Sequence, residues 1–588
     1  MNVYSHFQER VQELVKAMHA AGAWSAEVDV SRIMAEPPRD PAHGDVATNA
    51  ALVLAKQVGE KPRDLAQRIA DGLEGTDVAA TDVAGPGFVN IRLADTFWHD
   101  RLRELLSLGP MALLGDVGQG RTANVEYVSA NPTGPLHVGH ARGAIYGDVL
   151  ASLFDAVGFN VTREYYVNDA GAQVDTLTWS AYLRYLEALG ETMDESAYEG
   201  LYPGDYLVAV GKTLAEEHGT SLKGAVGEAS RNGALPDALV PVRQAVIDAM
   251  MDLIREDLAR VGITQEIFTS ERAMVDSGGI ERCLEALEAK QLVYTGVLEP
   301  PKGMKPEDWE PVPQTLFKST EFGDDLDRPL KKSDGTWTYF APDIAYHNDK
   351  VSRGYDVMID IFGVDHAGYV KRLKASVAAL SDGKADFDIL LTQLVNLFED
   401  GEPLRMSKRA GRFVTVRDVV DAVGKDVLRF IMLTRRTDVP LDFDLIKVKE
   451  QSKDNPVFYV QYAHARVCSV MRLAREAGFS TDDIANVDLS PLTHPDELAL
   501  IKQMSLWPRI VEGAAEAHEP HRIATYLHEL ASAFHSLWNL GRDDPSLRFM
   551  IDDNKEVTHA RLALISGVRQ VIAAGLGIFG VEPVEEMR

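Results

Sequence analysis

The alternation of apolar and polar residues along the chain predicts three regions with different secondary structure. Near the start, apolar residues recur at the spacing of an amphipathic helix, at Phe7, Val11, Leu14, Val15 and Met18. Further on, the segment AGPGFVNIRL has the pattern of a turn that leads into a strand. Residues 1–112 are therefore expected to form a small α+β domain.

The middle of the chain has the pattern of strands that alternate with helices. The segment NVEYVSA indicates a buried strand, and the small and apolar residues from Val138 to Phe154 indicate a helix after it. Two further strands are expected at DVMIDIFGVD and ILLTQLVNLF, beyond an irregular stretch from Leu298 to Gly335. Such alternation predicts an α/β domain with a Rossmann-like parallel sheet over residues 113–444.

The last region, residues 445–588, has few prolines and several helical periods, such as VFYVQYAHARVCSVMRLAREAG. It is predicted to be all α. With 588 residues, of which 45% are hydrophobic and 25% charged, the chain is long and apolar enough to fold into several domains. Its formal net charge of −29 should repel nucleic acid, so any RNA contact must rest on local basic patches.

The two cysteines, Cys283 and Cys468, lie too far apart in sequence to form a zinc cluster by themselves, and nothing requires an oxidising compartment. The first residues lack the apolar core of a secretory signal. The most apolar tail, Gln570 to Val581, is shorter than the roughly 20 residues that a membrane span needs. A cytoplasmic protein without a membrane span or a structural zinc ion is expected.

Two segments resemble common nucleotide-binding motifs but do not meet their requirements of position and spacing. Gly118, Gly120 and Ala123 match a dinucleotide fingerprint, but they precede a predicted strand, whereas that fingerprint must follow one. Gly211-Lys212-Thr213 lacks the glycine that opens a phosphate loop. The chain must therefore bind any nucleotide in another way.

A strand-to-helix junction, NPTGPLHVGH, carries the first candidate chemistry. Gly134 and Gly139 allow a ligand to approach the backbone, and the helix directs its unpaired N–H groups at an anion. His137 and His140, three residues apart, share one face of the first turn and could donate hydrogen bonds to phosphate. Alternatives are a metal site, which would need a third ligand, or a capping loop with surface histidines.

The second candidate is the loop RMSKRAGR, which contains Met406, Ser407 and Lys408. The stretch from Gly401 to Asp438 has nine basic and five acidic residues, a local positive region in an acidic chain. A lysine ammonium there could follow the phosphates of a nucleotide as they separate. A solvated basic loop is the alternative.

Together, the His-x-Gly-His junction and the Met-Ser-Lys loop, which is expected after the last strand, resemble the paired signature of class I aminoacyl-tRNA synthetases. Several acidic and polar residues, Glu126, Asn131, Tyr339, Asp343 and Asp365, suggest a pocket for a cationic side chain, although each could be an exposed acid or a helix cap. The strings EYVSANPTGPLHVGH, YYVNDAG, FAPDIAYH, DVLRF and NPVFYVQYAHAR resemble those of bacterial arginyl-tRNA synthetases, in the same order and over almost the whole chain.

This resemblance implies roles for particular residues. Asn131 would hold the α-amino group of L-arginine, Tyr339 and Asp343 would hold its guanidinium group, and Glu126 would support that pocket. Glu271, in FTSER, would belong to the same pocket. The ATP site is implied to contain Gly134, His137, Gly139, His140, Met406, Ser407 and Lys408, among which His137, His140 and Lys408 would be catalytic. Arg405 stands where the family usually has lysine.

The resemblance also implies partners. The reaction would use L-arginine, ATP with Mg²⁺ and tRNA(Arg), and a monomer is expected by analogy. Family members commonly need bound tRNA before they activate arginine. The N-terminal domain would contact the outer corner of the tRNA near the D-loop, and the helical domain would read the anticodon. Phe458, Tyr459, Tyr462 and Arg466 are the candidates to contact tRNA, although this helix face could equally pack on the catalytic domain.

Two other functions fit parts of the sequence. A cysteinyl-tRNA synthetase would have a similar helical domain but would need thiol ligands for zinc, which two distant cysteines do not supply. A synthetase-like RNA-binding protein without catalysis would be expected to lack the histidine pair or the lysine, and both are present. Nucleotidylyltransferases share the His-x-Gly-His element but are much shorter.

Overall fold

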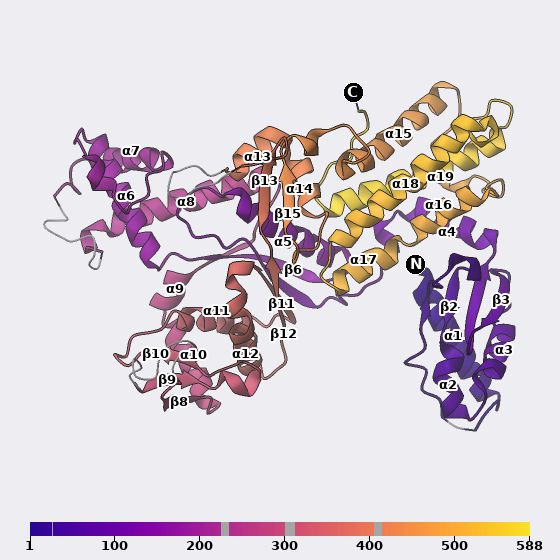
Figure 1. Cartoon of the computed structure of the whole chain (residues 1–588), viewed down its shortest axis with the longest axis horizontal. Coiled ribbons are helices and arrows are strands. Elements are labelled where there is room, and N and C mark those ends of the chain that lie inside the picture. Colours follow the sequence, from indigo (N-terminus) through magenta and orange to yellow (C-terminus); the bar gives the residue numbers. More distant parts are fainter. Residues whose placement is uncertain (26, 225–234, 300–311, 405–413, 588) are drawn as a thin grey trace. The chain divides into compact units, whose positions relative to one another are not determined.

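A computed structural model describes residues 1–25, 27–224, 235–299, 312–404 and 414–587 (Figure 1). The chain divides into two compact units. One unit is the central part, Gly118–Glu450, and the other combines both ends of the chain, Met1–Val117 and Gln451–Arg588.

A five-stranded parallel sheet lies at the centre of the unit Gly118–Glu450, with the strand order β12-β11-β5-β6-β7. The strands are β5 (Thr122–Glu126), β6 (Asn160–Val167), β7 (Ile267–Ser270), β11 (Val357–Gly363) and β12 (Asp386–Thr392). Because β5 comes first in the chain but lies in the middle of the sheet, the order of the strands reverses between β5 and β11. Parallel sheets bind ligands beside such a reversal, at the carboxyl ends of the strands.

Three helices border this reversal. Helix α5 (Val138–Ala156) follows β5, and most of its residues are buried because its alanines and glycines allow close packing. Helix α11 (Phe340–Ser352) precedes β11, and α12 (Val370–Leu380) follows it. Side chains of α11 and α12 share one apolar cluster, which includes Ile344 and Leu373. The packing of α11 sets the position of the acidic residues predicted near its start.

The segment ILLTQLVNLF is two strands, not the single strand predicted. Strand β12 ends at Thr392, and β13 (Val395–Glu399) belongs to a separate sheet of order β14-β13-β15. The apolar run misled the prediction, because Leu394 is a largely exposed connector. The other two strands are β14 (Glu402–Pro403) and β15 (Leu441–Asp444). The lysine loop comes after β12, the last strand of the parallel sheet along the chain, as predicted, and β15 of the separate sheet follows the loop.

Other elements of this unit form insertions. Helices α6 (Ala172–Ala188), α7 (Tyr206–His218) and α8 (Val240–Arg260) share an apolar core. Helices α9 (Glu271–Asp276) and α10 (Gly279–Ala289) precede an antiparallel sheet of β8 (Val293–Gly296), β9 (Gln314–Phe317) and β10 (Arg328–Lys331). Helices α13 (Val416–Val423) and α14 (Lys425–Met432) follow the lysine loop. Part of the stretch that looked irregular in sequence thus forms β9 and β10.

The beginning of the chain folds as an α+β structure. Its antiparallel sheet has the order β1-β2-β4-β3, from β1 (Ala35–Glu36), β2 (Val46–Thr48), β3 (Val78–Ala84) and β4 (Phe88–Leu93). Its helices are α1 (Val3–Ala20), α2 (Ala50–Val58), α3 (Pro62–Gly72) and α4 (Asp95–Leu108). Phe7, Val11 and Val15 of α1 are buried, as the helical spacing predicts.

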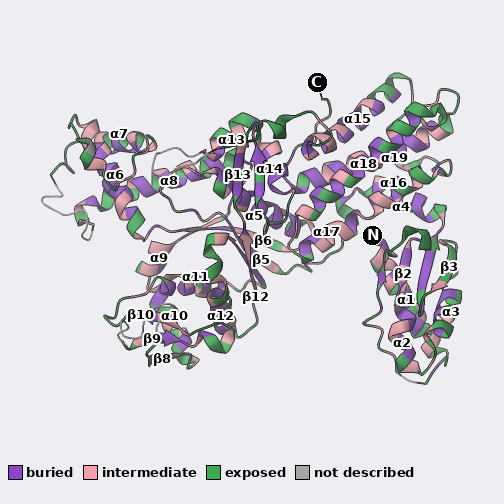
Figure 2. Ribbon diagram, viewed as in Figure 1, coloured by how far each residue is buried: buried purple, intermediate pink, exposed green. Residues whose placement is uncertain are grey.

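The end of the chain is helical in its described residues. It consists of α15 (Pro456–Glu476), α16 (Pro495–Ser505), α17 (Trp507–Glu516), α18 (His521–Asp543) and α19 (Lys555–Ile578). Among the helices that the structure describes, α19 is long and apolar enough to cross a membrane by those criteria alone, but 72% of its most apolar window is buried. Figure 2 shows buried residues along both α18 and α19. Packing within the bundle accounts for the apolar character of α19.

Candidate active site

The loop after β5 contains a strained turn. Val128 and Ser129 both have positive φ angles, 72° and 40°, which non-glycine residues rarely adopt. The surrounding structure holds this turn in place: the Ser129 hydroxyl donates to Glu126 (2.9 Å) and accepts from the backbone N–H of Tyr166 (3.0 Å). The buried hydroxyl group of Tyr165 donates to the Ala130 carbonyl at 2.7 Å. Strain that the fold maintains in this way is typical of functional sites.

The two histidines lie together at the start of α5. Their rings stack with centroids 3.7 Å apart. His137 is the N-cap and accepts from the N–H of Gly139 through Nδ1 (3.1 Å), while Nδ1 of His140 accepts from the N–H of His137 (3.3 Å). A Cβ atom on Gly139 would lie 2.8 Å from the His137 ring, so glycine is needed there. Gly134 lies against the Tyr206 ring, whose hydroxyl donates to the Thr133 carbonyl.

The chain that leaves the lysine loop runs beside this histidine motif. Val138 donates its N–H to the Val414 carbonyl (3.1 Å), and Val416 donates to Leu136 (2.8 Å). Met406, Ser407 and Lys408 lie outside the described residues, and the described chain resumes at Val414. Residues 414–416 and the histidine motif, far apart in sequence, are thus neighbours at the level of the backbone.

A buried carboxylate connects the same two segments. Asp257 of α8 accepts from the N–H of Leu136 at 2.9 Å and from the guanidinium group of Arg417 in α13. Arg417 also pairs with the more exposed Glu256. The sequence gives no signal for the role of Asp257, because nothing in its local pattern distinguishes it from a surface acid of an amphipathic helix.

The residues expected to bind arginine come from four elements. Asn131 is exposed and donates to Gln173 at the start of α6 (2.9 Å). Tyr339 precedes α11 and is 88% exposed, and Asp343 lies one turn further on, half-buried. Glu271 begins α9, directly after β7.

Electrostatics connects the acidic members of this group. Burial raises the pKa of Asp343 to about 7, His347 opposes that rise, and Glu271 and Glu126 add to it. Burial likewise raises the pKa of Glu271. Burial also raises the pKa of Tyr166, and both Glu271 and Asp343 contribute. These carboxyl groups share a region in which negative charge is unfavourable until a cation arrives.

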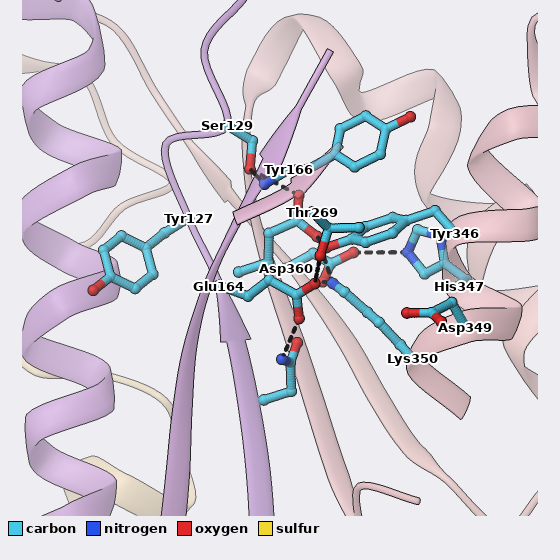
Figure 3. Close-up of polar contacts among 12 residues, drawn as sticks. Tyr127, Ser129, Glu164, Tyr166, Thr269, Tyr346, His347, Asp349, Lys350 and Asp360 are labelled. Atoms are coloured by element: carbon cyan, nitrogen blue, oxygen red, sulfur yellow. Dashed lines mark hydrogen bonds and ion pairs between the residues drawn. The ribbon is translucent and has the colours of Figure 1, made fainter. Parts of the chain in front are cut away.

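Glu126 of β5 is buried, and both of its carboxylate oxygens already accept hydrogen bonds. One of its oxygens accepts from Ser129, and the other accepts from the Tyr346 hydroxyl (2.8 Å) and from the Lys350 ammonium group. Burial raises its pKa, and Lys350 opposes that rise. Lys350 also donates to Asp360 at 2.7 Å (Figure 3), whereas Glu164, beside Glu126 in the sheet, is bound separately by Asn124 and Thr269. Sequence analysis did not find Tyr346, His347, Lys350 or Asp360, although the first three repeat at helical spacing on the face of α11 that bears Asp343.

The four candidate tRNA contacts lie on α15 and are all half-buried. Phe458 and Tyr462 stack with ring centroids 5.6 Å apart. The Arg466 guanidinium group lies 4.3 Å from the centre of the Tyr462 ring and 4.5 Å from that of Trp538 in α18. Tyr459 contacts His535 of the same helix. This face therefore packs partly on α18 while it keeps some exposed aromatic surface.

Both cysteines are free thiols buried in helices. Cys283 is buried in α10, where burial raises the pKa of its thiol to about 12, and Cys468 is buried in α15. Among the residues that the structure describes, no group of three or more His, Cys, Asp or Glu side chains is arranged to hold a metal ion.

Comparison with known proteins gives the class first. Three family models match, by description the arginyl tRNA synthetase N-terminal domain (residues 5–93), the class I (R) tRNA synthetase catalytic domain (111–201) and the DALR anticodon binding domain (460–587). With the parallel sheet and the histidine motif after its central strand, they define a class I aminoacyl-tRNA synthetase. The predicted fold class is confirmed.

Whole-chain comparison then gives the family. The chain is 57% identical to the arginine–tRNA ligase of Parvibaculum lavamentivorans and 58% identical to that of Roseobacter denitrificans, and each alignment covers all of both chains. The fold is also that of the Thermus thermophilus arginyl-tRNA synthetase, with a TM-score of 0.70 at 20% identity over all of both chains. The chain belongs to the arginyl-tRNA synthetase family, and the predicted family is confirmed.

Proposed function

We propose that this chain activates L-arginine with ATP and then transfers it to the 3′-terminal adenosine of tRNA(Arg). The arginine carboxylate attacks the α-phosphorus of ATP, pyrophosphate leaves, and arginyl-adenylate forms. A ribose hydroxyl of the tRNA then attacks the carbonyl carbon of the adenylate and releases AMP. The observation that carries this proposal is the stacked histidine pair at the start of α5, together with the carboxyl groups of Asp343 and Glu271, whose pKa values are raised by desolvation.

The first step needs no protein nucleophile, because positioning and charge stabilisation suffice. His137 and His140 would donate hydrogen bonds to the phosphate as negative charge builds on it. Such a donor typically contributes roughly 3–4 kcal/mol in a transition state. The N–H groups of the first turn of α5 are already engaged, because Val138 donates to Val414, and Gly139 and His140 donate to His137. Gly134, Gly139, Met406 and Ser407 would line the same site, and Lys408 would follow the departing pyrophosphate. Mg²⁺ would arrive bound to the phosphate oxygens of ATP.

Arginine would be selected by charge. Its guanidinium group would contact Asp343 and Tyr339, and Glu271 would face the same cation. The carboxyl groups of Asp343 and Glu271 have raised pKa values because they are desolvated, and a bound guanidinium would replace the lost solvation with charge-assisted hydrogen bonds. Asn131 would hold the α-amino group, and Glu126 would support the pocket from below.

The tRNA would contact two parts of the chain. Residues 445–588 would bind the anticodon, with bases stacked on the aromatic face of α15 that contains Phe458, Tyr459, Tyr462 and Arg466. Residues 1–112 would contact the outer corner of the tRNA, and residues 113–444 would carry out catalysis. We further propose a monomeric enzyme in the cytoplasm that needs bound tRNA before it activates arginine.

The test is exchange of labelled pyrophosphate into ATP with each amino acid in turn, with and without tRNA(Arg). Exchange should require arginine, and it should be much faster when tRNA is present. His140→Ala should slow exchange by two or more orders of magnitude while arginine binding stays nearly intact. Exchange with cysteine, or binding of tRNA without any exchange, would overturn the proposal.

A further inference from the structure

Three acids form a row across the middle of the parallel sheet, below the proposed arginine pocket. In the strand register, Glu126 of β5 is paired with Glu164 of β6 on one side and with Asp360 of β11 on the other. All three side chains are buried. Like charges on adjacent strands repel, and burial makes the repulsion stronger, so this acidic row requires cations from another element.

Helix α11 supplies the cations. The ammonium group of Lys350, 0% exposed, links β5 to β11, because it donates to Glu126 and to Asp360 (2.7 Å). Arg353, just after α11, pairs with Glu164 at 2.9 Å. Figure 3 shows Lys350 and His347 directed from the helix toward Asp360. These residues recur every three or four positions, so one face of α11 binds the acidic row.

The geometry also fixes the charge of His347. Its Nε2 lies 2.8 Å from a carboxylate oxygen of Asp360, and its Nδ1 lies 2.7 Å from the backbone carbonyl of Asp343. Both partners are acceptors, so both ring nitrogens must donate, and the imidazole is protonated. The positive charges of Lys350 and His347 then balance Glu126 and Asp360. The second hydrogen bond also ties this network to the backbone of Asp343.

The acidic row reaches the other side of the pocket through Glu126. Its second oxygen accepts from Ser129, which is one of the two strained residues in the turn that leads to Asn131. Lys350 therefore connects two walls of the proposed pocket: the helix that bears Asp343 and the turn that bears Asn131. Stability alone does not explain such a cluster, because well-packed apolar residues often stabilise a core as well as buried ion pairs do.

We propose that Lys350 is a positioning residue for arginine, whose ammonium group, bound to Glu126 and Asp360, sets the distance between α11 and the strained turn. The inference rests on the proposed function, since it assumes that arginine lies between Asp343 and Asn131. Lys350 itself does not contact the substrate. Its loss should change the affinity for arginine more than the rate of the chemical step.

The experiment compares Lys350→Met with the double variant Lys350→Met/Asp360→Asn in the full-length enzyme. The single variant leaves an unpaired buried negative charge, whereas the double variant restores the balance. Thermal unfolding, the arginine Kd by calorimetry, and KM and kcat for aminoacylation are measured for each. The double variant should regain most of the lost stability, yet its arginine Kd and KM should stay about tenfold or more above those of the wild type, with the ATP KM changed less than about threefold.

Lys290→Met is the matched control, because Lys290 is a half-buried lysine that donates to the Ala379 and Leu380 carbonyls and to Asp382, outside the acidic row. It should leave the arginine Kd unchanged. If the double variant regains wild-type arginine affinity along with its stability, Lys350 only neutralises charge and the proposal is wrong. An equal loss of arginine affinity in Lys290→Met would also overturn it.

Ser129→Ala keeps the inference testable should the lysine variants not fold. It removes the link between Glu126 and the strained turn without unpairing a charge, and it should raise the arginine Kd about threefold to tenfold. An unchanged Kd would contradict the proposed coupling.

Asp343→Asn separates this inference from the proposed function: if it weakens arginine binding and the Lys350 and Ser129 variants do not, the pocket stands and the positioning role fails. If the wild type does not bind arginine, the proposed function itself fails.

Discussion

Asp343 has a pKa of about 7 because its carboxyl group is buried on α11 without a full complement of cations. The same property that makes it suitable for a guanidinium group makes it unfavourable in the unliganded protein. Removing the charge of Asp343 should therefore stabilise the unliganded protein and weaken the binding of arginine.

We predict that arginine binding depends on pH through Asp343. A guanidinium group binds the ionised carboxylate, so the arginine Kd should rise up to about tenfold per unit as the pH falls below 7 and should level off above about pH 8. Calorimetric titration between pH 5.5 and 8.5 measures this dependence. Asp343→Asn should bind more weakly and should lose most of the dependence on pH. An equally steep profile in that variant would remove Asp343 from the pocket.

The same residue predicts an effect on stability. Since its pKa is raised in the folded state, the folded protein binds more protons than the unfolded one between about pH 4 and 7, and stability falls across that interval as pH rises. At pH 8 Asp343→Asn should therefore unfold less readily than the wild type, by about 1–3 kcal/mol. Denaturant titration without arginine at pH 8 and at pH 4.5 tests this, and the gain should be smaller at the lower pH.

Gly139 gives a prediction about the histidine pair. A methyl group there would press on the His137 ring, and a displacement of about 1 Å can slow catalysis by about 100-fold. Gly139→Ala should therefore slow pyrophosphate exchange strongly while the arginine Kd stays unchanged. Gly143→Ala in the same helix is the control, because its Cβ would make only ordinary contacts, 3.6 Å or more from its neighbours. Equal activity of the two variants would argue against the role given to His137.

At the scale of elements, helix α8 holds the histidine loop and α13 together through Asp257. Asp257→Asn keeps an acceptor for Leu136 but removes the charge that pairs with Arg417. We expect adenylate formation to slow about tenfold and the ATP KM to rise, with little change in the arginine Kd. Glu256→Gln, which changes the more exposed partner of the same arginine, should have little effect. If both variants behave alike, Asp257 has no special role.

Helix α15 allows a test of its two interpretations. Arg466→Ala removes a cation that lies against both Tyr462 and Trp538. If the face stacks on anticodon bases, the Kd for tRNA should rise about tenfold while thermal stability changes little. Arg472→Ala, further along α15 and paired with Glu586, is the control and should bind tRNA normally. A large loss of stability without any change in tRNA affinity would favour packing as the role of Arg466.

The periodicity of the sequence predicted most of these elements correctly, including α1, α15 and the strand–turn–helix around the histidine motif. It failed where one apolar run crossed from one sheet to another, at β12 and β13. Local apolar character reports burial but not the sheet to which a strand belongs, so this boundary could not be read from the pattern.

At the scale of the whole molecule, the chain forms two compact units. In the unit formed by both chain ends, Arg561 of α19 is buried and pairs with Glu497 of α16 at 2.6 Å. Removing one partner of such a pair costs about 3–5 kcal/mol, because the other charge stays buried. Arg561→Met should therefore destabilise that unit in denaturant titrations and leave the arginine Kd unchanged. The exposed Arg542→Met serves as the control, and a changed arginine affinity in Arg561→Met would contradict the separation.

The sequence by itself determined the family, the fold class and the histidine motif, because each depends on residues that are close together in the chain. His137, Gly139 and His140 are placed by one turn of one helix. Only the tertiary structure decided that Glu164, Glu126 and Asp360 form a row, and that Asp257 joins the histidine loop to α13. Those contacts depend on the register of neighbouring strands and on helix packing, which bring together residues that are far apart in sequence.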